Sequence, residues 1–390
     1  MQISVRAGAT ILGRSDDRTG YEHPDYRSQS VALSPRGARL DLTARLERTP
    51  LGLPPFQGER PSAAMVDLGR RLFFDRRLSA NGTLSCGMCH VPEQGFTQRE
   101  LATPVGFQGL TVKRNAPALY NVAYRPRLFF DGREWSLELQ IYSPLLAGNE
   151  MANPSIGAVI ERIAAIPEYA REFRTVFGGP PDVVNVGRAF AAYERGLVSA
   201  DSPFDRWHFG RDAEAVGDDV KRGFARFESL GCAGCHVLAE DYAHFTDDAF
   251  HDTGIGYRAA MAKGAPARVP LAPGVVIELA TAVPASGPND LGRYEATLEP
   301  HDRWRFRTPS LRNVAITAPY MHDGSLRTLE AVLDYYAAGG VPHQGQDPRI
   351  VPFALDASMR ADLVAFLNAL TGSDVEALAA DARSVEIGDL

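Results

Sequence analysis

The four cysteines of the chain form two Cys-x-x-Cys pairs, and a histidine follows each pair directly. The two motifs are Cys86-Gly-Met-Cys89-His90 and Cys232-Ala-Gly-Cys235-His236, which leave no cysteine over. This spacing is typical of covalent c-type haem attachment. Two thiols about one helical turn apart reach the two vinyl groups of one porphyrin, and the next imidazole faces its iron. We therefore expect two covalently bound c-type haems.

Three other uses of paired cysteines fit the sequence less well. A thioredoxin-like redox pair requires a strand-helix context, and it does not explain a histidine after both pairs. A zinc site usually has its two pairs about 15–20 residues apart, whereas 146 residues separate Cys86 from Cys232. A disulfide within either pair closes almost no loop and would stabilise the fold little.

Composition narrows the class of protein. The chain has 390 residues, of which 45% are hydrophobic and 23% charged, as in ordinary folded domains. Its net charge of -7 argues against a general nucleic-acid binder. No apolar run reaches the roughly 18 residues of a membrane-spanning helix. The most apolar stretch, residues 269–285, contains Glu278 and three prolines.

The N-terminal residues 1–6 contain no apolar signal core. Three explanations are open: a cytoplasmic protein, a start site placed too far downstream, or a signal that has been removed. Covalent haem attachment takes place outside the cytoplasmic membrane in bacteria. We therefore expect a periplasmic protein.

The pattern of apolar residues predicts helices next to both haem motifs. Apolar residues recur at helical spacing in the segments 62–74, 155–177, 182–198, 216–229, 326–337 and 358–370. A helix followed by a haem motif thus occurs twice, which indicates two related domains. Residues 240–310 are rich in Gly, Pro and Ala, so we expect loops there with a short hairpin.

Domain boundaries follow from these patterns. We expect an irregular N-terminal extension over residues 1–55, a first haem domain over 56–205, a second over 206–375, and a tail over 376–390. The hinge would lie within 199–212. We expect the chain after Thr371 to be expendable.

The axial ligands opposite His90 and His236 decide the chemistry, because an iron with an open site can bind peroxide or oxygen. After His90 the next histidine is His208, and the only methionine in between is Met151. We therefore expect an open first haem, with ligation by Met151 as the alternative. The candidates for the second haem are His244, His251, Met261, His301, Met321, His322, Tyr335, Tyr336, His343 and Met359.

Several further strings resemble the bacterial dihaem cytochrome c peroxidases and their relative MauG, in the order that this family has them. The strings begin at Leu68 (LGRRLFFD), Gly95 (GF), Arg114 (RNAPAL), Phe130 (FDGR), Arg307 (RTPSLRNV) and Ala318 (APYMHDG). The resemblance spans residues 60–370. It implies a mainly α fold with two cytochrome c-like haem domains packed against each other, long loops and little β structure.

The resemblance also implies site residues. A ligand to the second iron lies fourteen residues after the histidine of the Pro-Tyr-x-His string, and here that position is Tyr336, as in the MauG-like branch. Tyr335 is the fallback. Glu150 matches the acidic residue that moves protons at the peroxide-binding haem, Pro144 a proline that limits access to its iron, and Gln140 a glutamine near the tyrosinate. A calcium ion between the haems would be held by Asn115, Thr317 and Pro319.

Two tryptophans of the family are replaced. Phe130 stands where a tryptophan lies between the haems, and Leu230 stands where MauG has a surface tryptophan. Trp135, Tyr120 or Tyr124 could take over the first role. Trp207 and Trp304 remain candidates for a surface relay, although each would more commonly be a core residue.

The resemblance implies a hydrogen peroxide-dependent enzyme of MauG type. The two haems would share the oxidising equivalents of peroxide in a high-valent state, and they would oxidise an aromatic side chain, such as tryptophan, of a periplasmic partner protein. One alternative is a peroxidase that draws electrons from a small cytochrome or cupredoxin. Another is a dihaem electron carrier without catalytic activity, which would need strong ligands on both irons.

Overall fold

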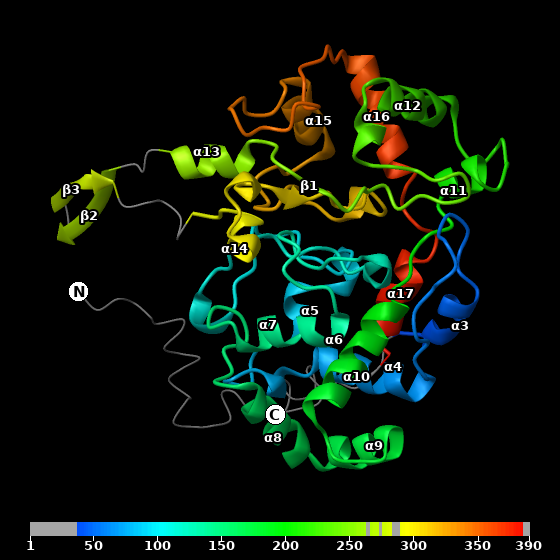
Figure 1. The fold of residues 1–390 in the computed structure, drawn as a ribbon, viewed down its shortest axis with the longest axis vertical. Helices are drawn as coiled ribbons and strands as arrows, with labels where there is room; N and C mark the ends of the chain where they lie inside the picture. Colours follow the sequence, from blue (N-terminus) through cyan, green and yellow to red (C-terminus); the bar gives the residue numbers. More distant parts are fainter. Residues whose placement is uncertain (1–36, 263–265, 273–274, 283–288, 385–390) are drawn as a thin grey trace.

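The computed structural model describes residues 37–262, 266–272, 275–282 and 289–384 (Figure 1). Most of the regular structure is helical. The α-helices are α3 (Leu42–Glu47), α4 (Ala63–Phe74), α5 (Cys86–Cys89), α6 (Leu137–Gln140), α7 (Tyr142–Leu146), α8 (Ile156–Ala165), α9 (Pro167–Phe177), α10 (Val183–Gly196), α11 (Pro203–His208), α12 (Asp218–Ser229), α13 (Ile255–Met261), α14 (Tyr294–Thr297), α15 (Leu329–Ala337), α16 (Ala357–Asn368) and α17 (Val375–Ala382).

The first half is organised around α4 and α10, which pack against each other. The Ser62 hydroxyl accepts the Met65 N–H and caps α4, as expected for a helix that begins after a serine. Gly69 lies at the crossing of the two helices. A Cβ atom there would lie 1.8 Å from the Ala189 carbonyl oxygen, so a glycine is required for the close approach.

The second half repeats this arrangement with α12 and α16. Gly223 lies at their crossing, and a Cβ atom there would lie 2.0 Å from the Asp362 carbonyl oxygen. Helix α12 leads directly into the second Cys-x-x-Cys-His motif, whereas residues 75–85 lie between the end of α4 and Cys86. In each half a motif thus follows the first helix of a crossing pair.

Two hydrophobic cores correspond to the two halves. The first contains buried residues of α4, α8, α9 and α10, and the second contains buried residues of α12, α15 and α16. Leu378 and Ala382 of α17 belong to the first core, although α17 lies at the other end of the chain. The expectation that the chain after Thr371 is expendable is therefore wrong for the described residues of α17. Helix α3 likewise lies within the extension that we expected to be irregular.

The described strands form two separate two-stranded sheets. β1 (Phe250–His251) pairs antiparallel with β4 (Phe306–Arg307), and β2 (Pro266–Ala272) pairs antiparallel with β3 (Val275–Ala282). The β2–β3 hairpin projects from the body of the molecule beside α13 (Figure 1). The prediction of a mainly helical fold with little β structure is confirmed. Among the described residues, none of the helices is both long and apolar enough to cross a bilayer.

Candidate active site

A cavity of about 800 Å³ lies between the two halves, and both haem motifs line it. All six motif residues contribute to its wall: Cys86, Cys89, His90, Cys232, Cys235 and His236. Helix α5 holds the first two thiols on one short turn, and a turn of 3₁₀ helix over Cys232–Gly234 begins the second motif. The structure thus brings together the two motifs that are far apart in the sequence.

The two motif histidines are oriented by the same device. The Nδ1 atom of His90 lies 3.0 Å from the Phe96 carbonyl oxygen, and that of His236 lies 2.9 Å from the Phe245 carbonyl oxygen. Donation of Nδ1–H to a carbonyl leaves Nε2 free as a metal ligand and fixes the plane of the ring. Burial lowers the pKa of both imidazoles, which favours the neutral form that binds iron.

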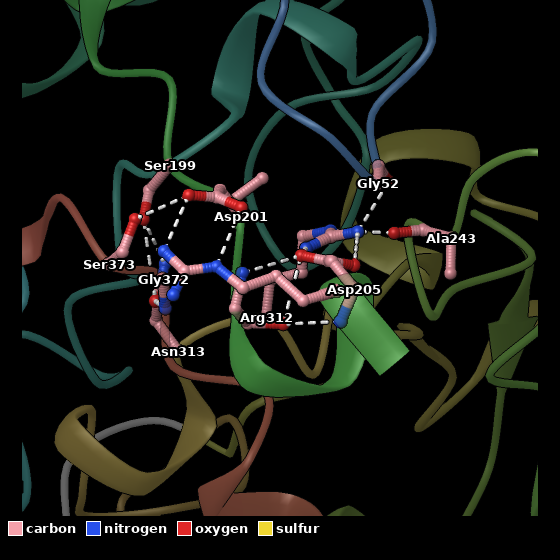
Figure 2. Close-up of polar contacts among 12 residues, drawn as sticks. Gly52, Ser199, Asp201, Asp205, Ala243, Arg312, Asn313, Gly372 and Ser373 are labelled. Carbon is pink, nitrogen blue, oxygen red and sulfur yellow. Dashed lines mark hydrogen bonds and ion pairs between the residues drawn. The ribbon is translucent and has the colours of Figure 1, made fainter. Parts of the chain in front are cut away.

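The loop that orients His236 is anchored to the segment joining the two halves (Figure 2). Arg312 donates from Nε to the Ala243 carbonyl oxygen at 2.6 Å and forms two bonds of 2.9 Å to the Asp205 carboxylate. Both side chains of this ion pair are almost fully buried. Ser310 adds a bond of 2.7 Å from its hydroxyl to the His244 carbonyl oxygen. The backbone from Ala243 to Phe245 is therefore held at three successive carbonyls.

Buried asparagines connect both halves to the same segment. Asn121 donates to the Ser199 carbonyl oxygen at 2.8 Å, and Asn313 donates to the Ser199 hydroxyl at 3.0 Å. Gly372 in turn donates its N–H to the Asn313 side chain at 2.8 Å (Figure 2). These contacts join the loops behind both haem motifs through one serine, which limits relative movement of the two motifs.

Tyr336 faces the cavity at the second motif. It lies deep inside the protein, and its ring keeps accessible surface because the cavity reaches it. Burial raises the pKa of its phenol well above the usual value, and the Tyr335 phenol and the Cys235 and Cys232 thiols raise it further. An isolated Tyr336 is therefore neutral, and only a cation such as iron at this position would displace its proton.

Most other candidate ligands of the second haem lie elsewhere. Those absent from the cavity wall are His244, Met261, His301, Tyr335, His343 and Met359. Tyr335 donates its hydroxyl to the Thr253 carbonyl oxygen. His251 lines the cavity, but its two ring nitrogens lie 2.7 Å and 2.8 Å from the carboxylates of Asp347 and Asp247. Met321 and His322 also reach the wall.

Glu150, Pro144 and Gln140 all line the part of the cavity that belongs to the first half. Burial raises the pKa of the Glu150 carboxyl, and the nearby Arg133 guanidinium partly opposes this shift. A carboxyl at this position can accept a proton and release it again. Met151 reaches the same wall, but its side chain is part of the first hydrophobic core.

Buried arginines give an independent test of whether haem fits the cavity. Arg125 and Arg307 line it, and they share the single carboxylate of Asp248 at 3.1 Å and 3.3 Å. The Nε and Nη2 atoms of Arg125 are buried and have no hydrogen-bond partner among the described residues. Buried guanidinium N–H groups without acceptors are costly, and the propionate groups of a haem would supply the missing acceptors. The residues present therefore fit the group.

Glu194 is a cavity residue that the sequence-based interpretation missed. It lies in α10 and is almost fully buried, and burial raises the pKa of its carboxyl to about 8. The available signal was its spacing, since Glu194 follows Phe190 by one helical turn on the apolar face. The arginines Arg125 and Arg307 were missed as well, because their function depends on partners far away in the sequence.

The three residues expected to hold calcium also reach the cavity wall together. Asn115 is buried, its backbone N–H donates to the His322 carbonyl oxygen at 2.7 Å, and its side-chain amide donates to the Ala102 carbonyl oxygen at 3.0 Å. Its amide oxygen has no donor in the described part of the chain. Amide and carbonyl oxygens are hard ligands of the kind that calcium prefers.

The sequence and the fold both match known dihaem proteins. The family model described as di-haem cytochrome c peroxidase matches residues 63–213. The chain is 40% identical over 334 residues to methylamine utilization protein MauG of Methylorubrum extorquens, with 84% of each chain covered. It is 33% identical over 320 residues to cytochrome c551 peroxidase of Pseudomonas aeruginosa, with 81% of each covered.

A solved structure of a MauG-like protein associated with microbial copper homeostasis superposes on this chain with a TM-score of 0.66. The two are 31% identical, and the match covers 86% of this chain and 96% of the other. These similarities extend over both halves and both motifs. The chain therefore belongs to the family of dihaem cytochrome c peroxidases that includes MauG.

Proposed function

We propose that this protein is a periplasmic, hydrogen peroxide-dependent dihaem oxidase of MauG type. It would oxidise an aromatic side chain, such as tryptophan, of a partner protein. Family membership supports peroxidase chemistry, two c-type haems and a redox partner. The observation that carries the finer proposal is Tyr336, a buried phenol in the cavity wall at the second motif. A peroxidase that draws electrons from a donor would need a ligand at this place through which its haem is easily reduced.

The two haems, when bound, supply the redox chemistry, because they take the oxidising equivalents of peroxide and pass them to an electron donor. The protein's own residues prepare each end of this process. Glu150 accepts a proton from hydrogen peroxide at one carboxylate oxygen and returns it to the oxygen that leaves as water. The Phe96 and Phe245 carbonyls hold the two histidine rings in place.

Pro144 and Gln140 act through shape and polarity. The Pro144 ring restricts the space above the first motif, so that a molecule as small as peroxide can enter while larger molecules are excluded. The Gln140 amide, which lines the cavity at the end of α6, would offer a hydrogen bond inside the pocket. We propose calcium at Asn115, Thr317 and Pro319, where it would hold the loops between the two halves together.

Stopped-flow spectroscopy of the diferric holoprotein tests the proposal. Hydrogen peroxide alone, without reductant, should change the Soret band at once and produce a long-lived near-infrared absorption from the coupled haems. A protein that is inert to peroxide until one haem has been reduced would contradict the proposal. That result would favour a peroxidase supplied by a small cytochrome or cupredoxin, the function that the similarity to cytochrome c551 peroxidase supports.

A further inference from the structure

Three aromatic side chains pack together on the second half, outside the cavity. The rings of Tyr257 and His343 are stacked, with centroids 4.1 Å apart and planes 6° apart. Trp304 meets both edge-on, at 5.2 Å from Tyr257 and 5.7 Å from His343. Tyr257 and Trp304 keep part of their surface accessible, whereas the His343 ring is buried. We call these three residues the aromatic cluster.

A buried carboxylate touches the aromatic cluster. The Asp252 carboxylate lies 3.1 Å from Nε2 of His343, and both side chains are almost fully buried. An ionised Asp252 carboxylate next to the stacked rings would stabilise a positive charge on them, which favours the loss of an electron from the cluster. The Trp304 Nε1 atom is buried, and none of the described residues accepts a hydrogen bond from it.

The packing of the cluster depends on a glycine of α13. A Cβ atom at Gly256 would lie 3.0 Å from the Trp304 ring and 3.1 Å from its Cβ atom. A larger residue would push Trp304 away from Tyr257, which lies one position further along the same helix. The close contact between α13 and Trp304 is therefore built into the sequence at this position.

A continuous path joins the cluster to Tyr336. The rings of Tyr335 and Tyr336 lie 5.6 Å apart. The Tyr335 hydroxyl donates to the Thr253 carbonyl oxygen, and Thr253 is bonded to Asp252 in the chain. The Arg258 guanidinium, next to Tyr257 in α13, lies 5.9 Å from the Tyr335 ring. Aromatic rings, one hydrogen bond and one peptide unit thus connect the cavity wall with the partly exposed rings.

We propose that Tyr257 and Trp304 form an electron-entry site, through which an aromatic side chain of a protein partner is oxidised by way of Tyr335 and the second haem. This inference rests on the proposed function. One hydrogen peroxide takes up two electrons and two protons and becomes two waters. Each electron comes from the cluster, which the donor refills. The donor side chain therefore loses two electrons and two protons for each peroxide.

Trp207 provides the matched control. It is also partly buried in the second half, but its ring packs among Phe204 at 5.7 Å, His208 at 5.6 Å and Phe224 at 5.9 Å. Phe204 and Phe224 belong to the second hydrophobic core, and Trp207 packs against it. Phenylalanine is much harder to oxidise than tyrosine or tryptophan, so Trp207 has no comparable path to Tyr336 through the residues that surround it.

The experiment treats the diferric holoprotein with hydrogen peroxide in the absence of any donor. Freeze-quenched samples are examined by EPR for protein radicals, and digested samples by mass spectrometry for side chains that have gained oxygen. Wild type and W207F should show a tyrosine or tryptophan radical and oxygen added at Tyr257 or Trp304. Y257F/W304F should lose both signals while its Soret and far-ultraviolet spectra stay unchanged. Y335F should reduce them.

Two outcomes are distinguished. Radical and oxidised peptides that persist unchanged in Y257F/W304F, or that lie only at residues such as Trp207, would overturn this inference and leave the proposed function intact. Peroxide that leaves the diferric spectra unchanged would contradict the proposed function instead. Photo-oxidation of the same variants by flash-quenched tris(bipyridine)ruthenium(III), which needs no peroxide, then tests the site independently with the same radical and peptide readouts.

Discussion

Pro144 and Tyr336 occupy equivalent positions in the two halves of the protein. Each lies eight residues beyond a hydroxyl side chain that caps a helix, Ser136 for α6 and Thr328 for α15. The turns before these caps are also alike, because each contains an isolated antiparallel bridge. This common spacing places a side chain without a ligand atom, Pro144 of α7, in the first half and a phenol, Tyr336 of α15, in the second.

This equivalence gives the two haems of the proposal their different roles. A pyrrolidine ring cannot bind iron, so in the proposal the first motif would keep space for peroxide beside Glu150. A phenol can bind iron as an anion, so the second motif would receive a strongly donating ligand. The two side chains would thus separate the peroxide-binding end from the end that exchanges electrons with a donor.

Replacing Glu150 should slow peroxide consumption. Glu150→Gln removes the proton acceptor but preserves the size of the side chain, so the rate with hydrogen peroxide should fall about 10²–10⁴-fold. Glu161→Gln, at an exposed position of α8, is the matched control and should leave the rate unchanged. Stopped-flow rates at equal haem content measure both. A Glu150→Gln protein with the wild-type rate would rule out this role.

The same carboxyl predicts a pH dependence. Burial raises the pKa of Glu150 above that of an ordinary glutamate, and only the ionised carboxylate can accept a proton from peroxide. The rate should therefore rise with pH through a midpoint above the usual glutamate range. In Glu150→Gln this rise should disappear. A midpoint that is unchanged in the variant would assign the titration to another group.

Close helix crossings should make two glycines intolerant of a methyl group. Gly69→Ala and Gly223→Ala each place a Cβ atom against a backbone carbonyl, so the helices must shift. Overpacking of this kind costs about 1–3 kcal/mol in the free energy of unfolding. Gly179→Ala is the control, because a Cβ atom there meets nothing within 4 Å. Guanidinium unfolding should show a lowered midpoint only for the first two variants.

Helix α17 should stabilise the first half. Arg70 and Asp381 form a buried ion pair with two bonds of 3.1 Å. Asp381→Ala removes the buried carboxylate that pairs with the Arg70 guanidinium, so it should lower the free energy of unfolding by about 3–5 kcal/mol. Asp67→Ala removes the partly exposed partner of the same arginine and should cost about 0–1 kcal/mol. Equal losses in the two variants would argue against a structural role for α17.

Calcium content tests the residues between the two halves. Asn115→Ala removes the only side-chain oxygen proposed as a ligand, so the purified protein should lose bound calcium while keeping both haems. Elemental analysis of calcium and iron in the same sample gives the ratio directly. Wild-type protein that holds no calcium, or a variant that holds as much as wild type, would refute the site.

The sequence predicts those features that depend on local spacing. The two haem motifs, the capped helix α4 and the amphipathic helices α10, α12, α15 and α16 all follow from residues close together in the chain. The segment 155–177 was predicted as one helix, but Pro167 begins a second one, because a proline fits the first turn of a helix and not its interior.

Features that depend on partners far apart in the sequence could not be predicted from local spacing. The pairing of Arg312 with Asp205, the packing of α17 on the first core, and the shared carboxylate of Arg125 and Arg307 join residues far apart in sequence. Periodicity reports which face of a helix is buried but not what covers it. Glu194 differs from these residues, because its spacing on the apolar face of α10 gave a usable signal.

EPR of the resting diferric holoprotein tests the central claim most directly. The account predicts one high-spin ferric haem, which is the open site at His90, and one low-spin ferric haem, which is ligated by His236 and Tyr336. Tyr336→Phe should change the low-spin signal and leave the high-spin signal in place, whereas Tyr335→Phe should change neither. Two low-spin signals in the wild-type protein, or a low-spin signal insensitive to Tyr336→Phe, would contradict the account.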